Sequence, residues 1–138
     1  MIIYIDENMS PYLAQGLNIL QIPLNHRQTE TIQIRSVKEV FGEGAKDEAW
    51  IPEAGQESSC IITQDYNIHQ IRHQKELCRE YNLGMFYFRP PSKSGFSYWD
   101  MLVLMIKHWP DITRKAIEEN KPFSYRITSR NARLESME

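Results

Sequence analysis

The chain has 138 residues, of which 41% are hydrophobic and 25% are charged. A chain of this length can bury a substantial core but is too short for two ordinary domains, so we expect one domain. The composition excludes disordered and collagen-like chains. The net charge of −2 excludes a nucleic-acid-binding surface that covers the whole protein, so an acidic polymer would need a local basic patch or a bound metal ion.

Strand and helix signals alternate along the chain. A strand is predicted at residues 2–5, and Ser10 then caps a helix that has Pro11 in its first turn. Further strands are predicted at 32–40, 60–63, 85–88 and 123–128, the last as a half-exposed edge strand. Further helices are predicted at 46–55, 66–82 and 97–120, with a break or restart at Pro110.

This order of elements predicts an α/β fold, specifically a three-layer α/β/α sandwich with a mostly parallel central sheet. We expect a single domain over 1–130, followed by a polar tail at 131–138 that is frayed or bound to something else. Apolar residues at helical spacing predict the inward faces of the helices. On this basis the residues expected to pack inward include Tyr12, Leu20, Trp99 and Ile106.

The sequence also predicts where the protein is found. The apolar start is too short for a signal peptide, and no apolar stretch approaches the length of a membrane span. Two cysteines, Cys60 and Cys78, do not make a disulfide framework and are expected to be buried thiols. We therefore predict a cytoplasmic protein without a membrane partner.

Acidic residues stand where predicted strands end. Asp6 follows the first strand and Asp65 follows the strand at 60–63, and the carboxyl ends of parallel strands meet at one edge of a sheet. Asp47, at a helix start after a glycine-containing loop, is expected over the same edge. Crowded carboxylates repel each other unless a cation lies among them, and oxygen ligands suit Mg²⁺ or Mn²⁺. Glu7 and Glu48 are expected to support this site. Each could instead be a solvated turn residue, or a carboxylate that interacts favourably with the dipole at the start of a helix.

Three short motifs carry a resemblance to a known family: Ile-Asp-Glu-Asn-Met-Ser at 5–10, Gly-Ala-Lys-Asp-Glu at 44–48 and Ile-Thr-Gln-Asp-Tyr-Asn-Ile at 62–68. In this order and spacing they resemble the compact PIN-like domains related to VapC-type toxins. The resemblance implies a metal-dependent ribonuclease, in many members a toxin held inactive by an antitoxin protein. It also implies that Asp6, Asp47 and Asp65 bind the metal.

One position departs from the family pattern. The family has a second acidic residue after the Thr-x-Asp motif, where this chain has Asn67. An asparagine offers a carbonyl oxygen or a hydrogen bond but no charge. We therefore expect weaker metal binding or only one firmly held ion, and we place Asn67 with the residues that contact the substrate.

Basic residues near the same edge are expected to hold phosphate groups. Arg89 ends the strand at 85–88, and its planar guanidinium can form two hydrogen bonds with a phosphate. Lys46 could extend a basic rim that binds RNA. The alternative for Arg89 is a surface salt bridge. Trp99 and Trp109 are expected in the core or in the interface of a homodimer.

The leading functional hypothesis is a Mg²⁺- or Mn²⁺-dependent endoribonuclease, the toxin of a toxin–antitoxin pair, with RNA as substrate and an antitoxin as partner. A non-catalytic interaction module with a PIN-like fold is the second hypothesis, favoured by Asn67 and by the net negative charge. A receiver-type phosphoacceptor domain is the third. That class needs a lysine before a turn proline at the end of a late strand, where this chain has Arg89.

Overall fold

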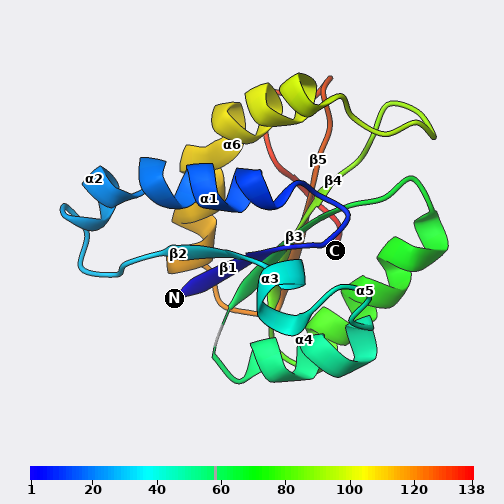
Figure 1. Ribbon diagram of the computed structural model, residues 1–138, viewed down its shortest axis with the longest axis horizontal. Coiled ribbons are helices and arrows are strands. Elements are labelled where there is room, and N and C mark those ends of the chain that lie inside the picture. The colour runs from blue at the N-terminus through cyan, green and yellow to red at the C-terminus, as the bar shows by residue number, and fades with distance from the viewer. Residues whose placement is uncertain (58) are drawn as a thin grey trace.

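A six-stranded sheet in the order β2-β1-β3-β4-β5-β6 forms the centre of the computed structural model, which describes residues 1–57 and 59–138 (Figure 1). Strands β1 to β5 are parallel, and β6 pairs antiparallel with β5. The strands are β1 (Ile2–Ile5), β2 (Gln33–Ser36), β3 (Cys60–Gln64), β4 (Gly84–Phe88), β5 (Phe123–Ile127) and β6 (Glu135–Ser136).

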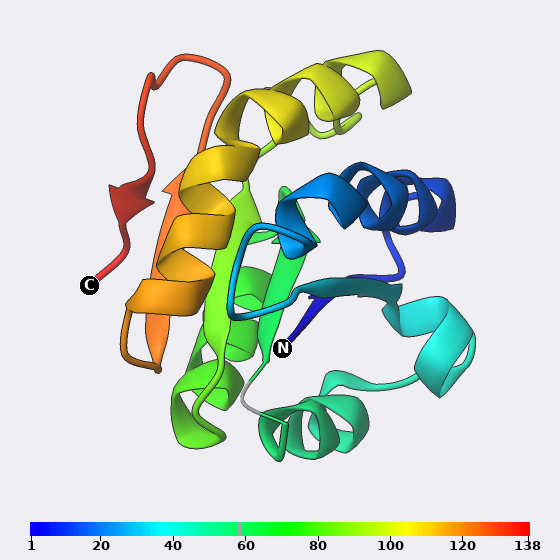
Figure 2. The same ribbon diagram turned by 90° about the vertical axis from the view of Figure 1, so that its left-hand side faces the viewer.

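Helices cover both faces of this sheet. The helices are α1 (Pro11–Leu20), α2 (Ile22–Asn25), α3 (Val37–Phe41), α4 (Asp47–Gly55), α5 (Ile68–Glu80) and α6 (Tyr98–Glu118). Helices α1 and α6 lie on one face, and α4 and α5 lie on the other (Figures 1 and 2). The predicted three-layer α/β/α sandwich with a mostly parallel sheet is thus confirmed. None of the helices within 1–57 and 59–138 is both long and apolar enough to cross a membrane.

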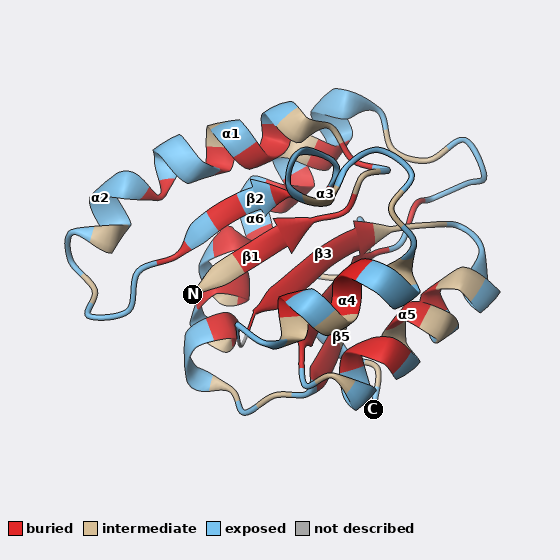
Figure 3. Cartoon of the chain, turned by 60° about the horizontal axis from the view of Figure 1, so that its bottom comes forward, coloured by how far each residue is buried: buried red, intermediate tan, exposed pale blue. Residues whose placement is uncertain are grey.

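The central strands are apolar on both sides because each side faces a helical layer. In β1, Ile3 and Ile5 belong to the core shared with α1 and α6, whereas Tyr4 belongs to the core shared with α4 and α5. The same alternation continues in β3 and β4, and Figure 3 shows most of β1 and β3 in the colour of buried residues. The period-2 alternation of a strand therefore produces two separate hydrophobic cores from one set of strands.

The chain order places a crevice between β1 and β3. From β1 the chain passes to β2 on one side and later returns to β3 on the other side. The strand order therefore reverses at the β1–β3 pair, and this is where open α/β sheets bind ligands, beyond the carboxyl ends of the strands. Asp6 and Asp65 follow these two strands directly.

Several local predictions were wrong. The strand predicted at 32–40 ends at Ser36, because the chain then turns into α3, which buries Val37 and stops before Gly42 at a φ of +94°. Helix α6 continues through Pro110, which removes one backbone donor while the core contacts of Met105 and Ile112 hold the helix on both sides. Strand β5 is not an edge strand, since β6 pairs with its outer side.

Four residues predicted to pack inward are instead exposed. Tyr12 and Leu20 of α1 are 69% and 58% exposed, and Trp99 and Ile106 of α6 are 69% and 49% exposed. Both helices carry apolar residues around much of their circumference, so the sequence pattern alone does not select the buried side. The division into a domain at 1–130 and a tail at 131–138 stays a prediction.

Candidate functional site

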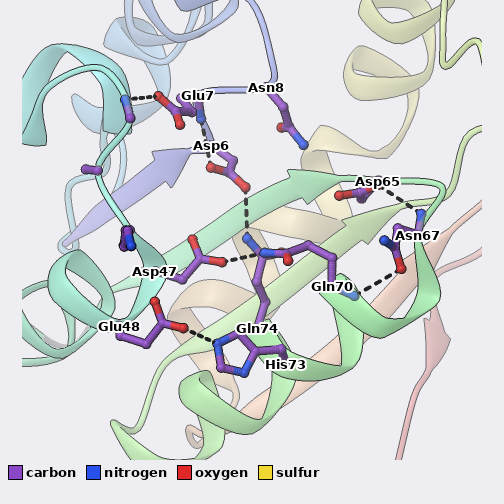
Figure 4. Close-up of a pocket in the computed structure, with 13 residues that line it drawn as sticks. Asp6, Glu7, Asn8, Asp47, Glu48, Asp65, Asn67, Gln70, His73 and Gln74 are labelled. Atoms are coloured by element: carbon purple, nitrogen blue, oxygen red, sulfur yellow. Dashed lines mark hydrogen bonds and ion pairs between the residues drawn. The ribbon is translucent and has the colours of Figure 1, made fainter.

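A pocket of about 420 Å³ opens at the carboxyl ends of β1 and β3 (Figure 4). We call it the acid pocket, since its lining includes the five carboxylates Asp6, Glu7, Asp47, Glu48 and Asp65. The only lysine or arginine in the lining is Lys46. The acidic side chains singled out in the sequence therefore line one pocket, at the topological switch point of the sheet.

Asp6 forms the floor of the acid pocket. Its side chain is only 6% exposed, and three donors hold its carboxylate. The Glu7 backbone N–H donates to Oδ1 at 2.8 Å, while the Thr63 hydroxyl and the Gln74 amide donate to Oδ2 at 2.7 and 3.0 Å. Thr63 and Gln74 are themselves buried. This carboxylate is therefore fixed in position by neutral donors, which leave its negative charge uncompensated.

Asp47 stands at the start of α4 and approaches Asp6. The indole N–H of Trp50 donates to its Oδ1 at 3.1 Å, and the Gln70 amide donates to its Oδ2 at 2.8 Å. Burial raises the pKa of Asp47, and the nearby charge of Asp6 raises this pKa further, although hydrogen bonds oppose the rise. A carboxylate whose pKa is raised by burial and by a neighbouring negative charge lies where a cation is favoured.

Glu7 and Glu48 turn toward the rim of the pocket. Glu7 Oε2 accepts from the Gly44 backbone N–H at 2.9 Å and so joins the end of β1 to the loop before α4. Glu48 Oε1 lies 2.6 Å from the His73 ring on α5. The Glu48 backbone N–H and then the His73 ring lower the pKa of Glu48. Both glutamates thus brace the pocket wall, as Figure 4 shows.

Asp65 and Asn67 shape the turn between β3 and α5. Asp65 Oδ1 accepts from the Asn67 backbone N–H at 2.9 Å. Asn67 is the N-cap of α5, since its Oδ1 accepts from the backbone N–H groups of His69 and Gln70 at 3.0 and 3.4 Å. The residue that departs from the family pattern therefore has a structural task that an asparagine performs as well as an aspartate.

Arg89 lies outside the acid pocket. It follows β4 and lines a neighbouring cleft with residues that follow β5. Seven of the eight site residues predicted from the sequence line the acid pocket, and Arg89 is the eighth.

Sequence reasoning missed the side of the pocket that α5 provides. Gln70, His73 and Gln74 each contact one of the carboxylates. A sequence signal was present, because Gln74 is a polar residue within the buried stripe of α5 between Ile71 and Cys78. A polar residue in such a stripe needs a buried partner.

The donor atoms that line the acid pocket are of the kind that binds a divalent metal ion. Carboxylate oxygens are the donors that Mg²⁺ and Mn²⁺ prefer, and the raised pKa of Asp47 beside the charge of Asp6 indicates that a cation would relieve repulsion. The donor set therefore fits such an ion. As they lie, however, the acidic, histidine and cysteine side chains of residues 1–57 and 59–138 do not form a group of three at ligand distance.

Comparison with known proteins gives one match. A family model described as a PIN like domain matches residues 1–90, a range that contains the whole acid pocket. A comparison with curated proteins found no match, and a comparison with solved structures also found none.

Proposed function

The chain belongs to the PIN-like domain family, and we propose that it is a metal-dependent endoribonuclease that hydrolyses RNA phosphodiester bonds. The observation that carries this proposal is the acid pocket. Asp6 and Asp47 approach each other at the switch point of the sheet and are held by neutral donors, and among residues 1–57 and 59–138 no lysine or arginine forms an ion pair with either carboxylate. A structural salt-bridge network would have placed a lysine or arginine between them.

In this proposal Asp6, Asp47 and Asp65 hold Mg²⁺ or Mn²⁺. When bound, such an ion supplies an activated water and stabilises negative charge on the phosphodiester. Thr63 and Gln74 keep the Asp6 carboxylate in one orientation, so that little reorganisation is needed when the ion arrives. Gln74 and Thr63 are positioning residues, because they act through Asp6.

Glu48 and His73 form a second functional unit at the rim of the pocket. Their contact of 2.6 Å joins a carboxylate to an imidazole at the rim of the pocket. The His73 ring also lines the pocket, so we assign it to contact with an RNA phosphate that enters beside Glu48. Lys46 and Asn67 also line the pocket, and we assign both to substrate contact.

We further propose that the protein is the toxin of a toxin–antitoxin pair related to VapC-type toxins. It would act in the cytoplasm, without a membrane partner, and an antitoxin would hold it inactive. A homodimer is compatible with the exposed apolar residues of α1 and α6.

A non-catalytic interaction module is the second candidate function. The observation that favours it is Asn67, which caps α5 where the family has a further acidic residue. Calorimetric titration with Mn²⁺ separates the two functions. Binding that Asp6→Asn weakens supports the nuclease, whereas the absence of binding up to millimolar Mn²⁺ supports the module.

The direct test is Mn²⁺-dependent cleavage of single-stranded RNA by the parent chain and by Asp6→Asn and Asp65→Asn. We expect both variants to lose cleavage by roughly 100-fold or more while keeping the far-UV circular dichroism of the parent. Asp111→Asn is the matched control, because Asp111 is a half-buried residue of α6 that pairs with Arg114 and lies outside the acid pocket. Cleavage by Asp6→Asn at the parent rate would show that the proposed site is wrong.

A further inference from the structure

A second cleft lies at the same edge of the sheet as the acid pocket, beyond the ends of β4 and β5. It has a volume of about 410 Å³, and its charged residues are Arg89, Arg126, Arg130 and Glu135. We call it the arginine cleft. Three guanidinium groups share this cleft with one carboxylate, so it is positively charged in a protein whose net charge is −2.

Glu135 does not neutralise this cleft. Arg126 Nη2 donates to its Oε1 at 2.7 Å, and Asn131 Nδ2 donates to its Oε2 at 2.8 Å. Arg126 and Glu135 are also register partners of β5 and β6, so their ion pair fastens the last strand. Arg89 and Arg130 are exposed, and within the described part of the chain neither forms an ion pair. Their two charges are therefore available to a ligand.

The strand register connects the arginine cleft to the acid pocket. Thr63 of β3 pairs with Tyr87 of β4, and Tyr87 pairs with Arg126 of β5. The side chains of residues that pair in register across parallel strands project from the same face of the sheet. Thr63, whose hydroxyl holds Asp6, therefore lies on the same face as Arg126, with one strand between them.

Tyr87 of β4 lies between the two sites. Its hydroxyl donates to the backbone oxygen of Asp65, which lines the acid pocket, at 2.7 Å. Burial raises the pKa of Tyr87, the charge of Arg89 lowers it, and the charges of Asp65 and Arg126 also act on it. The tyrosine hydroxyl is thus within electrostatic reach of charged residues from both sites.

We propose that the arginine cleft binds backbone phosphates of a single-stranded RNA while another phosphate of the same strand lies over the acid pocket, an inference that rests on the proposed nuclease function. The carboxylates of the acid pocket repel a polyanion, so the affinity for RNA must come from positive charge close by. Guanidinium groups match phosphate oxygens in shape and charge. Two strand spacings separate β3 from β5, which is roughly 10 Å and short enough for one flexible strand to contact both sites.

The family likeness covers only part of this arrangement. The matching family model ends at residue 90, so Arg126 and Arg130 lie beyond it. The acid pocket thus belongs to the matched part of the chain, and most of the arginine cleft belongs to the part that follows.

The test measures binding of a fluorescein-labelled single-stranded RNA of mixed sequence by fluorescence anisotropy in EDTA, over a series of salt concentrations. We expect Arg89→Gln and Arg130→Gln each to weaken binding roughly 3- to 10-fold and to reduce the slope of log affinity against log salt by about 0.7. Arg126 is left unchanged, because its replacement would also release Glu135 and β6. Arg114→Gln is the control, since it removes the same charge from the far end of α6 and should bind RNA like the parent.

Binding of RNA by both cleft variants at parent affinity would overturn the proposal, as would a parent chain that does not bind the RNA. Variants that lose binding of poly-L-glutamate but keep binding of RNA would assign the cleft to an acidic protein partner and would also overturn it. Cleavage is measured separately with Mn²⁺. A parent chain that binds RNA through the arginines but does not cleave it contradicts the nuclease function and leaves the arginine cleft in place.

Discussion

The two faces of the sheet differ most at the carboxyl ends of its strands. On the face covered by α1 and α6, β1 and β3 present Ile5 and Ile62 to the core. On the face covered by α4 and α5, the next residues along, Asp6 and Thr63, are polar and buried. One face therefore contributes apolar packing up to the sheet edge, whereas the other gives up apolar packing there to hold a carboxylate.

This difference separates stability from function within one small domain. Apolar burial on both faces is the main stabilising term, and only on the α1/α6 face does it continue to the sheet edge. On the α4/α5 face, burial and the charge of Asp6 raise the pKa of Asp47, so its ionised form opposes folding. Substitutions on the two faces should therefore have different effects on unfolding and on RNA cleavage.

The largest expected effect is on stability, from Phe86→Ala on the α1/α6 face. Phe86 is fully buried in β4 and contacts the rings of Phe123 and Tyr125 at centroid distances of 5.4 and 6.3 Å. We expect a loss of about 3–5 kcal/mol in the free energy of unfolding, because the change leaves a cavity. Urea unfolding measures this loss. Trp99→Ala on the exposed side of α6 should cost less than about 0.5 kcal/mol, and equal losses would contradict the assignment of the core.

Thr63→Val is expected to have a smaller effect on stability but a direct effect on cleavage. Valine has the shape of threonine but lacks the hydroxyl that donates to Asp6 at 2.7 Å. A hydrogen bond to a charged group contributes about 1.5–3 kcal/mol, so we expect a loss of about 2 kcal/mol in unfolding and slower cleavage by the folded fraction. Thr113→Val is the matched control, because that hydroxyl donates to backbone oxygens within α6. If both variants cleave RNA like the parent, Thr63 does not position Asp6.

His108 should make stability depend on pH on the face without the acid pocket. Burial lowers the pKa of His108 from its ordinary value of 6.5, and the charge of Lys107 lowers it further. The unfolded chain therefore takes up a proton near pH 6.5, whereas the folded chain does so only at lower pH. Protonation thus favours the unfolded chain, and stability is lost as the pH falls below 6.5. The loss is at most about 1.4 kcal/mol per pH unit. Urea midpoints at neutral and mildly acidic pH should differ less in His108→Leu than in the parent, whereas His26→Leu, at an exposed site, should match the parent.

The strands that form the site were predictable from the sequence, since β1 and β3 are short apolar runs that end in acids. Parallel strands then bring Asp6 and Asp65 to one edge of the sheet by geometry alone. Predictions failed where the same residue types suit two structures. Val37 and Val40 fit a strand pattern, but they lie in α3 because the chain must turn toward α4.

The partners of the acids were less predictable than the acids. Gln70 and Gln74 reach Asp47 and Asp6 from α5. Gln74 lies in the buried stripe of α5, which indicates a buried partner, whereas Gln70 has no such signal, since glutamine on a helix is usually solvated. Arg89 was predicted at the correct edge of the sheet, but its cleft depends on residues after β5. A buried polar residue such as Gln74 indicates that a partner exists but not which distant residue it is, so three-dimensional structure was needed to identify these contacts.

The smallest expected effect on stability comes from Asp47→Asn, and its sign is opposite to the others. Burial and the charge of Asp6 raise the pKa of Asp47, so its ionised form opposes folding near neutral pH. Asparagine removes this charge but offers one acceptor oxygen where Trp50 and Gln70 now contact two. We expect the free energy of unfolding in EDTA at neutral pH to rise by less than about 1 kcal/mol, while Mn²⁺-dependent cleavage is lost.

The difference in free energy of unfolding between the variant and the parent should shrink as the pH falls through the raised pKa of Asp47, because the parent then becomes neutral at this position. Asp111→Asn, measured by the same urea unfolding, should not show the rise. An Asp47→Asn chain that is less stable than the parent at neutral pH would mean that its two hydrogen bonds outweigh the repulsion, and the two faces would then differ less than proposed.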